Sequence, residues 1–213
     1  KPSLEILGKE YNENSSQEES QLRSIVCGLY AKYSNDKEFN NYFVNLFETN
    51  KYAEYNDGNY YNLVLSIAGM DPSVSVTKFL DKFIQAETPQ IEGRYRAMLW
   101  GLSDPKTPEI VLNAILEGTI RGADAPYIVS GLISHTENGE TAWMAVKDSW
   151  DKLLKVMPEW TSSRILDGLP SIYNEVLGND IEKFVKSNPL PSAEKITKQK
   201  IERLNANIKF KNS

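Results

Sequence analysis

The sequence predicts an all-α fold, and three observations lead to that prediction. Apolar residues recur at spacings of three and four along the 213 residues, which is the periodicity of amphipathic helices. Capping residues and prolines, which mark the starts and ends of helices, separate these runs at short intervals. Convincing strand patterns are missing from the sequence. Because each predicted helix has one apolar stripe to bury, helix-on-helix packing is the architecture that remains.

The first two helices are predicted to form a hairpin. Ser16 and Glu19 have the spacing of a capping box, which marks the start of a helix. Asp36 is the expected cap of the second helix, whose apolar face lies within residues 39–47. The short connection between them brings the two helices side by side. The expected buried face of the first helix consists of Leu22, Ile25, Val26, Leu29 and Tyr33.

Stop and start signals in the middle of the chain predict further helices. One helix is expected to end at Gly69, with a proline just beyond it. The dipeptides Thr88-Pro89 and Thr107-Pro108 each predict a helix start. In each dipeptide the threonine can accept a hydrogen bond from a first-turn N–H group, and proline occupies a position where its missing donor costs nothing.

The second half of the chain is predicted to contain the longest helix. Asn138-Gly139 opens this helix, and Pro158 ends it. Trp143 and Trp150 are seven residues apart, or two helical turns, so both lie on one face. We therefore expect both tryptophans to pack in the core.

Two more helices are predicted toward the end of the chain. Asp180 is the expected cap of a helix that carries Phe184 on its apolar face. Ser192 is the expected cap of the last helix, which runs through residues 196–208. We assign structural roles to Phe184 and Ser192, as to the two tryptophans.

The order of these elements predicts a HEAT-like α-solenoid. Roughly ten helices are joined by short turns, and pairs of helices recur at about forty residues, a period typical of such arrays. We therefore expect stacked antiparallel helical hairpins that form a single helical superhelix domain over residues 1–213. A compact helical bundle is the alternative.

Composition excludes several classes of function. The net charge is −5 with both signs interspersed, so the chain lacks the basic surface that binds nucleic acid. Apolar runs are too short to span a membrane. Cys27 is the single cysteine, which excludes an intramolecular disulfide and favours a cytoplasmic location. The start of the chain has neither an initiator Met nor a signal peptide, so we expect a fragment of a longer protein.

The residue inventory predicts no catalytic or metal site within this chain. His135 is the single histidine and lies in a polar turn, so we expect a solvated loop residue there and no histidine-pair zinc site. Cys27 has apolar neighbours and is expected to be a small buried residue. Arg121 and Asp124 are three residues apart, which allows either a local ion pair or a surface that meets a partner.

Four segments resemble zinc aminopeptidases of the aminopeptidase N family, near the end of those enzymes. Residues 143–153 carry two tryptophans around a short charged run, as in that family, and residues 189–194 resemble its downstream companion. Residues 21–26 are similar to the family's Leu-Arg-Ser helix, and residues 120–124 to its Val-Arg-x-Gln-Asp turn. The resemblance covers nearly the whole chain. The departures include Ala123, Ala145, Ser149 and Phe210.

The resemblance implies a multidomain exopeptidase. In that family a catalytic domain with an HExxH helix holds zinc and removes N-terminal residues from peptides, while a C-terminal helical superhelix covers the catalytic cleft. This chain is similar to the superhelix alone, so its implied partners are the catalytic domain of the same polypeptide and peptide substrates. By this reading Arg121 and Asp124 help to bind the distal end of a peptide.

Two other readings stay open from the sequence. A stand-alone HEAT-like interaction scaffold would need a polar capping repeat at each end. A helical ligand carrier would need a large apolar pocket.

Overall fold

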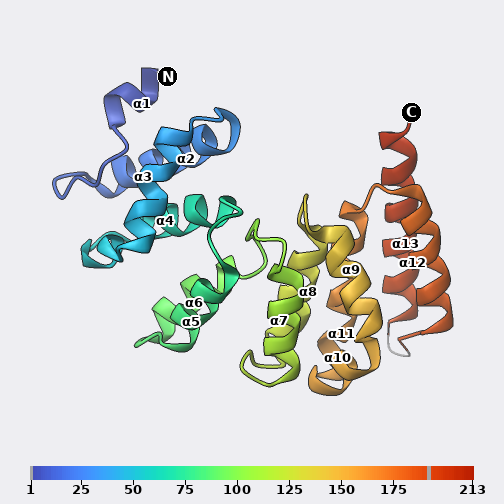
Figure 1. Cartoon of the computed structure of the whole chain (residues 1–213). Helices are drawn as coiled ribbons and strands as arrows, with labels where there is room; N and C mark the ends of the chain where they lie inside the picture. The colour runs from blue at the N-terminus through green and yellow to red at the C-terminus, as the bar shows by residue number, and fades with distance from the viewer. Residues whose placement is uncertain (1, 191–192) are drawn as a thin grey trace. The chain divides into compact units, whose positions relative to one another are not determined.

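The structure, a computed structural model, describes residues 2–190 and 193–213 (Figure 1). Within these residues the regular elements are helices and none is a strand, so the predicted all-α class is confirmed. In chain order the elements are α1 (Pro2–Leu7), α2 (Gln17–Tyr33), α3 (Lys37–Glu48), η1 (Lys51–Glu54), α4 (Gly58–Met70), α5 (Val76–Ile84), α6 (Pro89–Met98), α7 (Thr107–Leu116), α8 (Ala125–Ser134), α9 (Gly139–Asp148), α10 (Trp150–Val156), α11 (Glu159–Ser162), η2 (Ser163–Ser171), α12 (Glu175–Ser187) and α13 (Glu194–Lys211), with η1 and η2 being 3-10 helices.

The chain divides into two compact units. Unit 1 contains the residues up to Met98 together with Leu102–Asp104, and unit 2 contains Leu99–Gly101 and Pro105–Ser213. Within each unit, helices pack on their sequence neighbours and on the next helix but one, as in the pairs α2 with α4, α4 with α6, and α7 with α9. Contact between alternate helices is the pattern of stacked hairpins, in which alternate helices share a layer.

Side-chain caps start the first helices of unit 1. Ser16 Oγ accepts from the N–H of Glu19 at 3.2 Å, and Glu19 Oε2 accepts from the N–H of Ser16 at 3.0 Å, which completes the predicted capping box of α2. Asp36 Oδ1 accepts from the N–H of Phe39 at 3.0 Å, as predicted for α3. Asp57 caps α4 in the same way. Each cap satisfies N–H groups that the first helical turn leaves without a partner.

The predicted buried face of α2 is wrong. The residues that α2 buries are Ser20, Arg23, Cys27 and Ala31. Of the predicted face, Val26 is half-buried, whereas Leu22, Ile25, Leu29 and Tyr33 are about half exposed or more. Arg23 donates from Nε to the carbonyl of Leu7 at 3.0 Å and from Nη2 to Ser15 Oγ at 2.9 Å. The small and polar face of α2 therefore packs inward, and the apolar face points outward.

Aromatic side chains fill the core of unit 1. Phe47 stacks on Phe79 with ring centroids 4.5 Å apart, and both side chains are fully buried. Three buried tyrosines form a chain of hydroxyls, with Tyr52 to Tyr95 at 2.5 Å and Tyr61 to Tyr95 at 3.0 Å. Burial raises the pKa of Tyr52 and Tyr95 far above that of a free phenol, so both remain neutral donors and acceptors.

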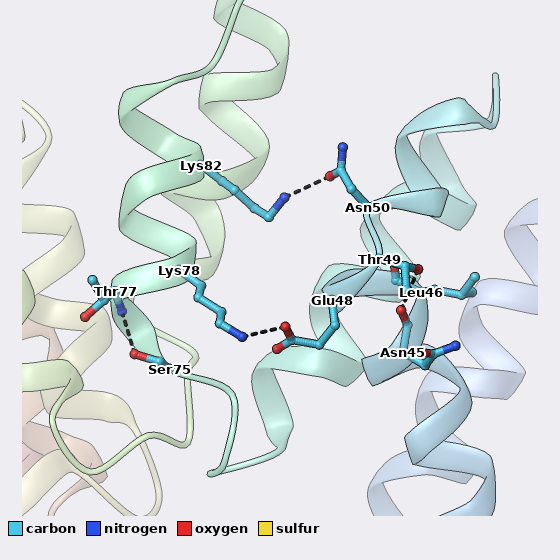
Figure 2. Close-up of polar contacts among 9 residues, drawn as sticks. All are labelled: Asn45, Leu46, Glu48, Thr49, Asn50, Ser75, Thr77, Lys78 and Lys82. Carbon is cyan, nitrogen blue, oxygen red and sulfur yellow. Dashed lines mark hydrogen bonds and ion pairs between the residues drawn. The ribbon is translucent and has the colours of Figure 1, made fainter.

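Two lysines of α5 join it to the end of α3 (Figure 2). Lys78 Nζ pairs with Glu48 Oε2 at 2.5 Å, and Lys82 Nζ donates to Asn50 Oδ1 at 2.8 Å. The Lys82 ammonium also lies 5.5 Å from the ring centroid of Phe47. Burial lowers the pKa of Lys82 below its usual value. Asn50 has the positive φ of 60° that an asparagine tolerates well, which turns the chain out of α3 toward this contact.

The long helix predicted after Asn138-Gly139 is interrupted once. It is divided at Ser149, where φ is −107° and ψ is 8°, into α9 and α10. The N–H of Ser149 still bonds to the carbonyls of Ala145 and Val146, so the interruption is local. The longest helix of the described residues is instead α13, with 18 residues.

Two predicted caps of unit 2 are also wrong. Thr107 is the first residue of α7 and not its cap, and its buried Oγ1 has no hydrogen-bond partner among the described residues. Helix α12 begins at Glu175 with Asn174 as its cap, so Asp180 lies within the helix. The predicted cap at Thr88 is correct, since Thr88 Oγ1 accepts from the N–H of Ile91 at 3.3 Å. The predicted cap Ser192 lies outside the described residues.

Candidate functional site

The turn between α7 and α8 carries Arg121 and Asp124. Gly118 adopts a φ of +81° at the end of α7, a conformation that glycine enters without strain. Ile120 then turns inward with its side chain fully buried, and its N–H bonds to the carbonyl of Ala114 at 3.0 Å. The buried isoleucine ties the turn to α7 and leaves the next side chain, that of Arg121, at the surface.

Gly122 fixes the other side of this turn. A Cβ atom at this position would overlap the carbonyl oxygen of Val156, at the end of α10. The backbone of the turn thus lies directly against the backbone of α10, and any side chain at position 122 would force them apart. The position of Arg121 is therefore set by its two neighbours, the buried Ile120 before it and the tightly packed Gly122 after it.

Arg121 and Asp124 form the local ion pair that their spacing allows. Arg121 Nε donates to Asp124 Oδ2 at 3.0 Å. The arginine side chain is 64% exposed and the aspartate side chain 28%. An exposed ion pair of this kind contributes about 0–1 kcal/mol to the free energy of unfolding, so it adds little to the stability of the domain. What the pair does is hold a guanidinium at the surface in a defined orientation.

The predicted structural aromatics come together in unit 2. The ring centroids lie 6.5 Å apart for Trp143 and Trp150, 5.7 Å for Trp143 and Phe184, and 5.5 Å for Trp150 and Phe184. All three pairs have the edge-to-face geometry that aromatic quadrupoles favour. Trp143 is fully buried, and its indole N–H has no acceptor among the described residues. The group joins α9, α10 and α12.

An ion pair that sequence reasoning missed lies beside these rings. Lys147 Nζ contacts both carboxylate oxygens of Asp180, at 2.9 and 2.7 Å, and lies 5.6 Å from the ring centroid of Phe184. It links α9 to α12. Sequence patterns that act over a few residues do not predict this pair, because its two partners are 33 residues apart.

His135 is not the solvated loop residue that the sequence suggested. It is half-buried at the end of α8, and its Nδ1 accepts from the backbone N–H groups of Glu137 and Asn138 at 3.3 and 3.2 Å. Burial lowers the pKa of His135 below 6.5, although Glu137 and a hydrogen bond to the backbone of Gly101 oppose that shift. The neutral imidazole thus braces the turn that leads into α9, which itself has no side-chain cap. The spacing of acceptor and donors, two and three residues apart, resembles that of an Asx turn.

A polar hollow of about 490 Å³ in unit 1 was not predicted from the sequence either. It lies at the starts of α2 and α4, and two of its charged groups, Asp57 and Arg94, are bonded to neighbouring parts of the fold. Asp57 accepts from the N–H groups that it caps and from Ser20 Oγ at 2.5 Å. Arg94 donates to the carbonyl of Gly58 at 2.7 Å and to Asn62 Oδ1 at 2.9 Å. These hydrogen bonds account for Asp57 and Arg94 as structural residues, so we assign the hollow no ligand.

The residues present do not fit a zinc site. The chain has one histidine, His135, whose Nδ1 is engaged with backbone N–H groups, and one cysteine, Cys27, which is fully buried. In residues 2–190 and 193–213, no group of three His, Cys, Asp or Glu side chains is placed to hold a metal ion. None of the helices in this part of the chain is long and apolar enough to cross a membrane.

The fold and this inventory define a helical domain whose described residues hold no assembled metal site. Residues 1–206 match the family described as "ERAP1-like C-terminal domain". The chain belongs to this family, and its resemblance to the C-terminal domain of the aminopeptidase N family is confirmed.

Two curated relatives are aminopeptidases by name. Aminopeptidase M1-B of Oryza sativa subsp. japonica is 31% identical over 134 residues, which are 60% of this chain and 15% of the relative. Aminopeptidase M1 of Arabidopsis thaliana is 25% identical over 155 residues, which are 70% of this chain and 17% of the relative. The matched stretch thus covers less than a fifth of either relative.

Proposed function

We propose that this chain is the non-catalytic C-terminal domain of a zinc aminopeptidase that removes N-terminal residues from peptides in the cytoplasm. The observation that carries the proposal is the match of residues 1–206 to the ERAP1-like C-terminal domain, together with relatives named aminopeptidases. The matched stretch covers 15% and 17% of those relatives, which leaves ample chain for a catalytic domain elsewhere in the polypeptide. The single cysteine supports the location.

The proposed role of the domain is to cover the catalytic cleft and to limit or position peptide substrates. Zinc, bound by the catalytic domain, supplies the Lewis acid that activates a water molecule. In this proposal residues 1–213 act as one superhelix domain and supply a wall of stacked helices. A peptide whose N-terminus lies at the zinc directs its carboxyl terminus away from it, toward such a wall.

Arg121 is the residue proposed to meet that carboxyl terminus. A guanidinium can receive a carboxylate in a bidentate manner, and the Arg121 side chain is 64% exposed. Asp124 accepts from Nε, and this bond orients the plane of the guanidinium. The tight backbone contact at Gly122 supports this role, because it holds the turn in place.

The test of the proposed function uses the full-length polypeptide. It should hydrolyse an aminoacyl reporter in a reaction that a zinc chelator abolishes, and the 213-residue chain alone should bind no stoichiometric zinc and cleave nothing. An inactive full-length polypeptide that lacks zinc would favour the interaction scaffold instead. Stoichiometric zinc in the 213-residue chain would contradict the assignment of a non-catalytic domain.

A further inference from the structure

The outer face of α2 is a continuous apolar stripe. The residues that form it lie three, four and four positions apart, so they share one side of the helix over three turns. Their exposed fractions are 49% for Leu22, 52% for Ile25, 55% for Leu29 and 71% for Tyr33. Most isolated exposed apolar residues need no explanation, but a stripe with the period of a helix marks a face that packs against something.

Polar contacts on the opposite face fix this orientation of α2. Ser20 Oγ donates to Asp57 Oδ2 at 2.5 Å, which joins α2 to the start of α4. The buried guanidinium of Arg23 bonds to Leu7 and Ser15, in the segment that precedes the helix. Rotating α2 to bury its apolar stripe would break all of these bonds and leave a buried charge without partners. The stripe is therefore exposed because of the fold, and not because of a loosely placed helix.

We propose that this stripe is the docking surface for an amphipathic helix of the same polypeptide, from the part that lies outside residues 1–213. This inference rests on the proposed function, which makes the chain one domain of a longer enzyme. The curated relatives are long enough to provide such a helix, since the matched stretch covers 15% and 17% of them.

The size of the stripe favours a helix of the same polypeptide over a second copy of the chain. The exposed parts of its four side chains sum to roughly 400 Å², about half of what each partner of a stable dimer buries. A tethered helix needs less area, because its effective concentration is in the millimolar range.

Charge sets the direction of the docked helix. Glu18 and Glu19 lie in the first turn of α2, and Lys32 lies in its last turn. A helix with the usual distribution, acidic at its start and basic at its end, meets complementary charges at both ends when it runs antiparallel to α2. The predicted occupant is thus an antiparallel helix with an apolar stripe of matching length, about 16 Å.

Cysteine labelling can test the proposal in the full-length polypeptide and in the 213-residue chain. The native Cys27 is fully buried and its thiol pKa is raised to about 11, so its reaction with a maleimide dye should be slow. In Ile25→Cys, the new thiol should react readily in the 213-residue chain and at least tenfold more slowly in the full-length polypeptide. Asn41→Cys, at an exposed polar position of α3, is the matched control and should react at similar rates in both.

Two outcomes would overturn the proposal. Equal labelling of Ile25→Cys in the two proteins would show that nothing else in the polypeptide covers the stripe. A 213-residue chain that sediments as a dimer, and becomes monomeric in Leu29→Ser, would assign the stripe to a second copy. Peptidase activity is read separately: an active enzyme with equal labelling would refute the docking surface alone, and a protected Ile25→Cys in an inactive protein would refute the proposed function alone.

Discussion

His135 Nδ1 lies 3.2 Å from the backbone nitrogen of Asn138, and the ring acts as the acceptor of that hydrogen bond. An imidazole that accepts at Nδ1 must be neutral and carry its proton at Nε2. Protonation at Nδ1 would place an N–H against the N–H groups of Glu137 and Asn138. The turn between α8 and α9 is thus stabilised by one protonation state of His135.

A pH dependence follows from this geometry. The folded-state pKa of His135 lies below the unfolded value near 6.5, so the unfolded state binds more protons between these two values. The contribution of His135 is therefore complete above about pH 6.5 and is lost as the pH falls toward the folded-state pKa. Urea unfolding at pH 7.5 and pH 5.5, followed by tryptophan fluorescence, measures the loss.

His135→Asn is the control for this pH dependence. Asparagine keeps an acceptor for the same two N–H groups but does not titrate. The variant should lose less stability than the wild-type chain between the two pH values. An identical loss in both would show that His135 makes no contribution.

Trp143 should be a major anchor of unit 2. Trp143→Ala removes a fully buried ring that contacts Trp150 and Phe184, and we expect a loss of about 3–5 kcal/mol. Trp143→Phe should lose less, because the indole N–H has no acceptor to forfeit among the described residues. Urea unfolding followed by circular dichroism measures both.

Trp160→Ala is the control, because its side chain is 80% exposed. A change in the free energy of unfolding above ~0.5 kcal/mol in this variant would contradict the exposed position of Trp160.

Two glycine substitutions should act in opposite directions. Gly122→Ala forces a Cβ against the carbonyl oxygen of Val156 and should destabilise by about 1–3 kcal/mol. Gly93→Ala lies within α6, where the new Cβ meets Arg96 at an ordinary 3.9 Å, and should stabilise by about 0.5–1 kcal/mol. Thermal unfolding of both variants measures the difference. Equal effects of the same sign would contradict the described packing of the turn.

Arg121→Ala should raise KM for long peptides in the full-length enzyme. The expected change is roughly tenfold, for a lost interaction of about 1.4 kcal/mol, with no change for a single-residue reporter. Arg164→Ala is a close control, since Arg164 is 58% exposed and contacts Asp167, three residues on, at 3.4 Å. If the two variants behave alike, or if long and short substrates respond equally, Arg121 has a structural role only.

Signals that act over a few residues were predictable from the sequence. The capping box at Ser16 and the cap at Asp36 depend on a side chain and a backbone N–H three residues away, and both are present. Thr107 and Asp180 are residue types that often cap helices, but neither occupies the cap position of its helix. Helix α7 already includes Thr107 as its first residue, so the cap position falls on Lys106. Asp180 lies inside α12 and pairs with Lys147, which is distant in sequence.

The inward face of α2 was not predictable from periodicity. The pattern from Leu22 to Tyr33 identifies a helix and its apolar side, but it does not say which partner covers that side. In this chain α4 and the segment before α2 select the other side, through the polar contacts of Ser20 and Arg23. At the candidate site, the pairing of Arg121 with Asp124 was predictable because it is local, whereas the contact of Gly122 with Val156 joins distant segments.

The division into two units also separates the intrinsic chromophores of the chain. All four tryptophans, Trp100, Trp143, Trp150 and Trp160, belong to unit 2. Of the 11 tyrosines, all but Tyr127 and Tyr173 belong to unit 1, where the hydroxyls of Tyr52 and Tyr95 resist ionisation. Indole emission therefore follows unit 2, while phenolate absorbance that develops at high pH follows the opening of unit 1. One unlabelled sample can thus reveal whether the two units melt together or one after the other.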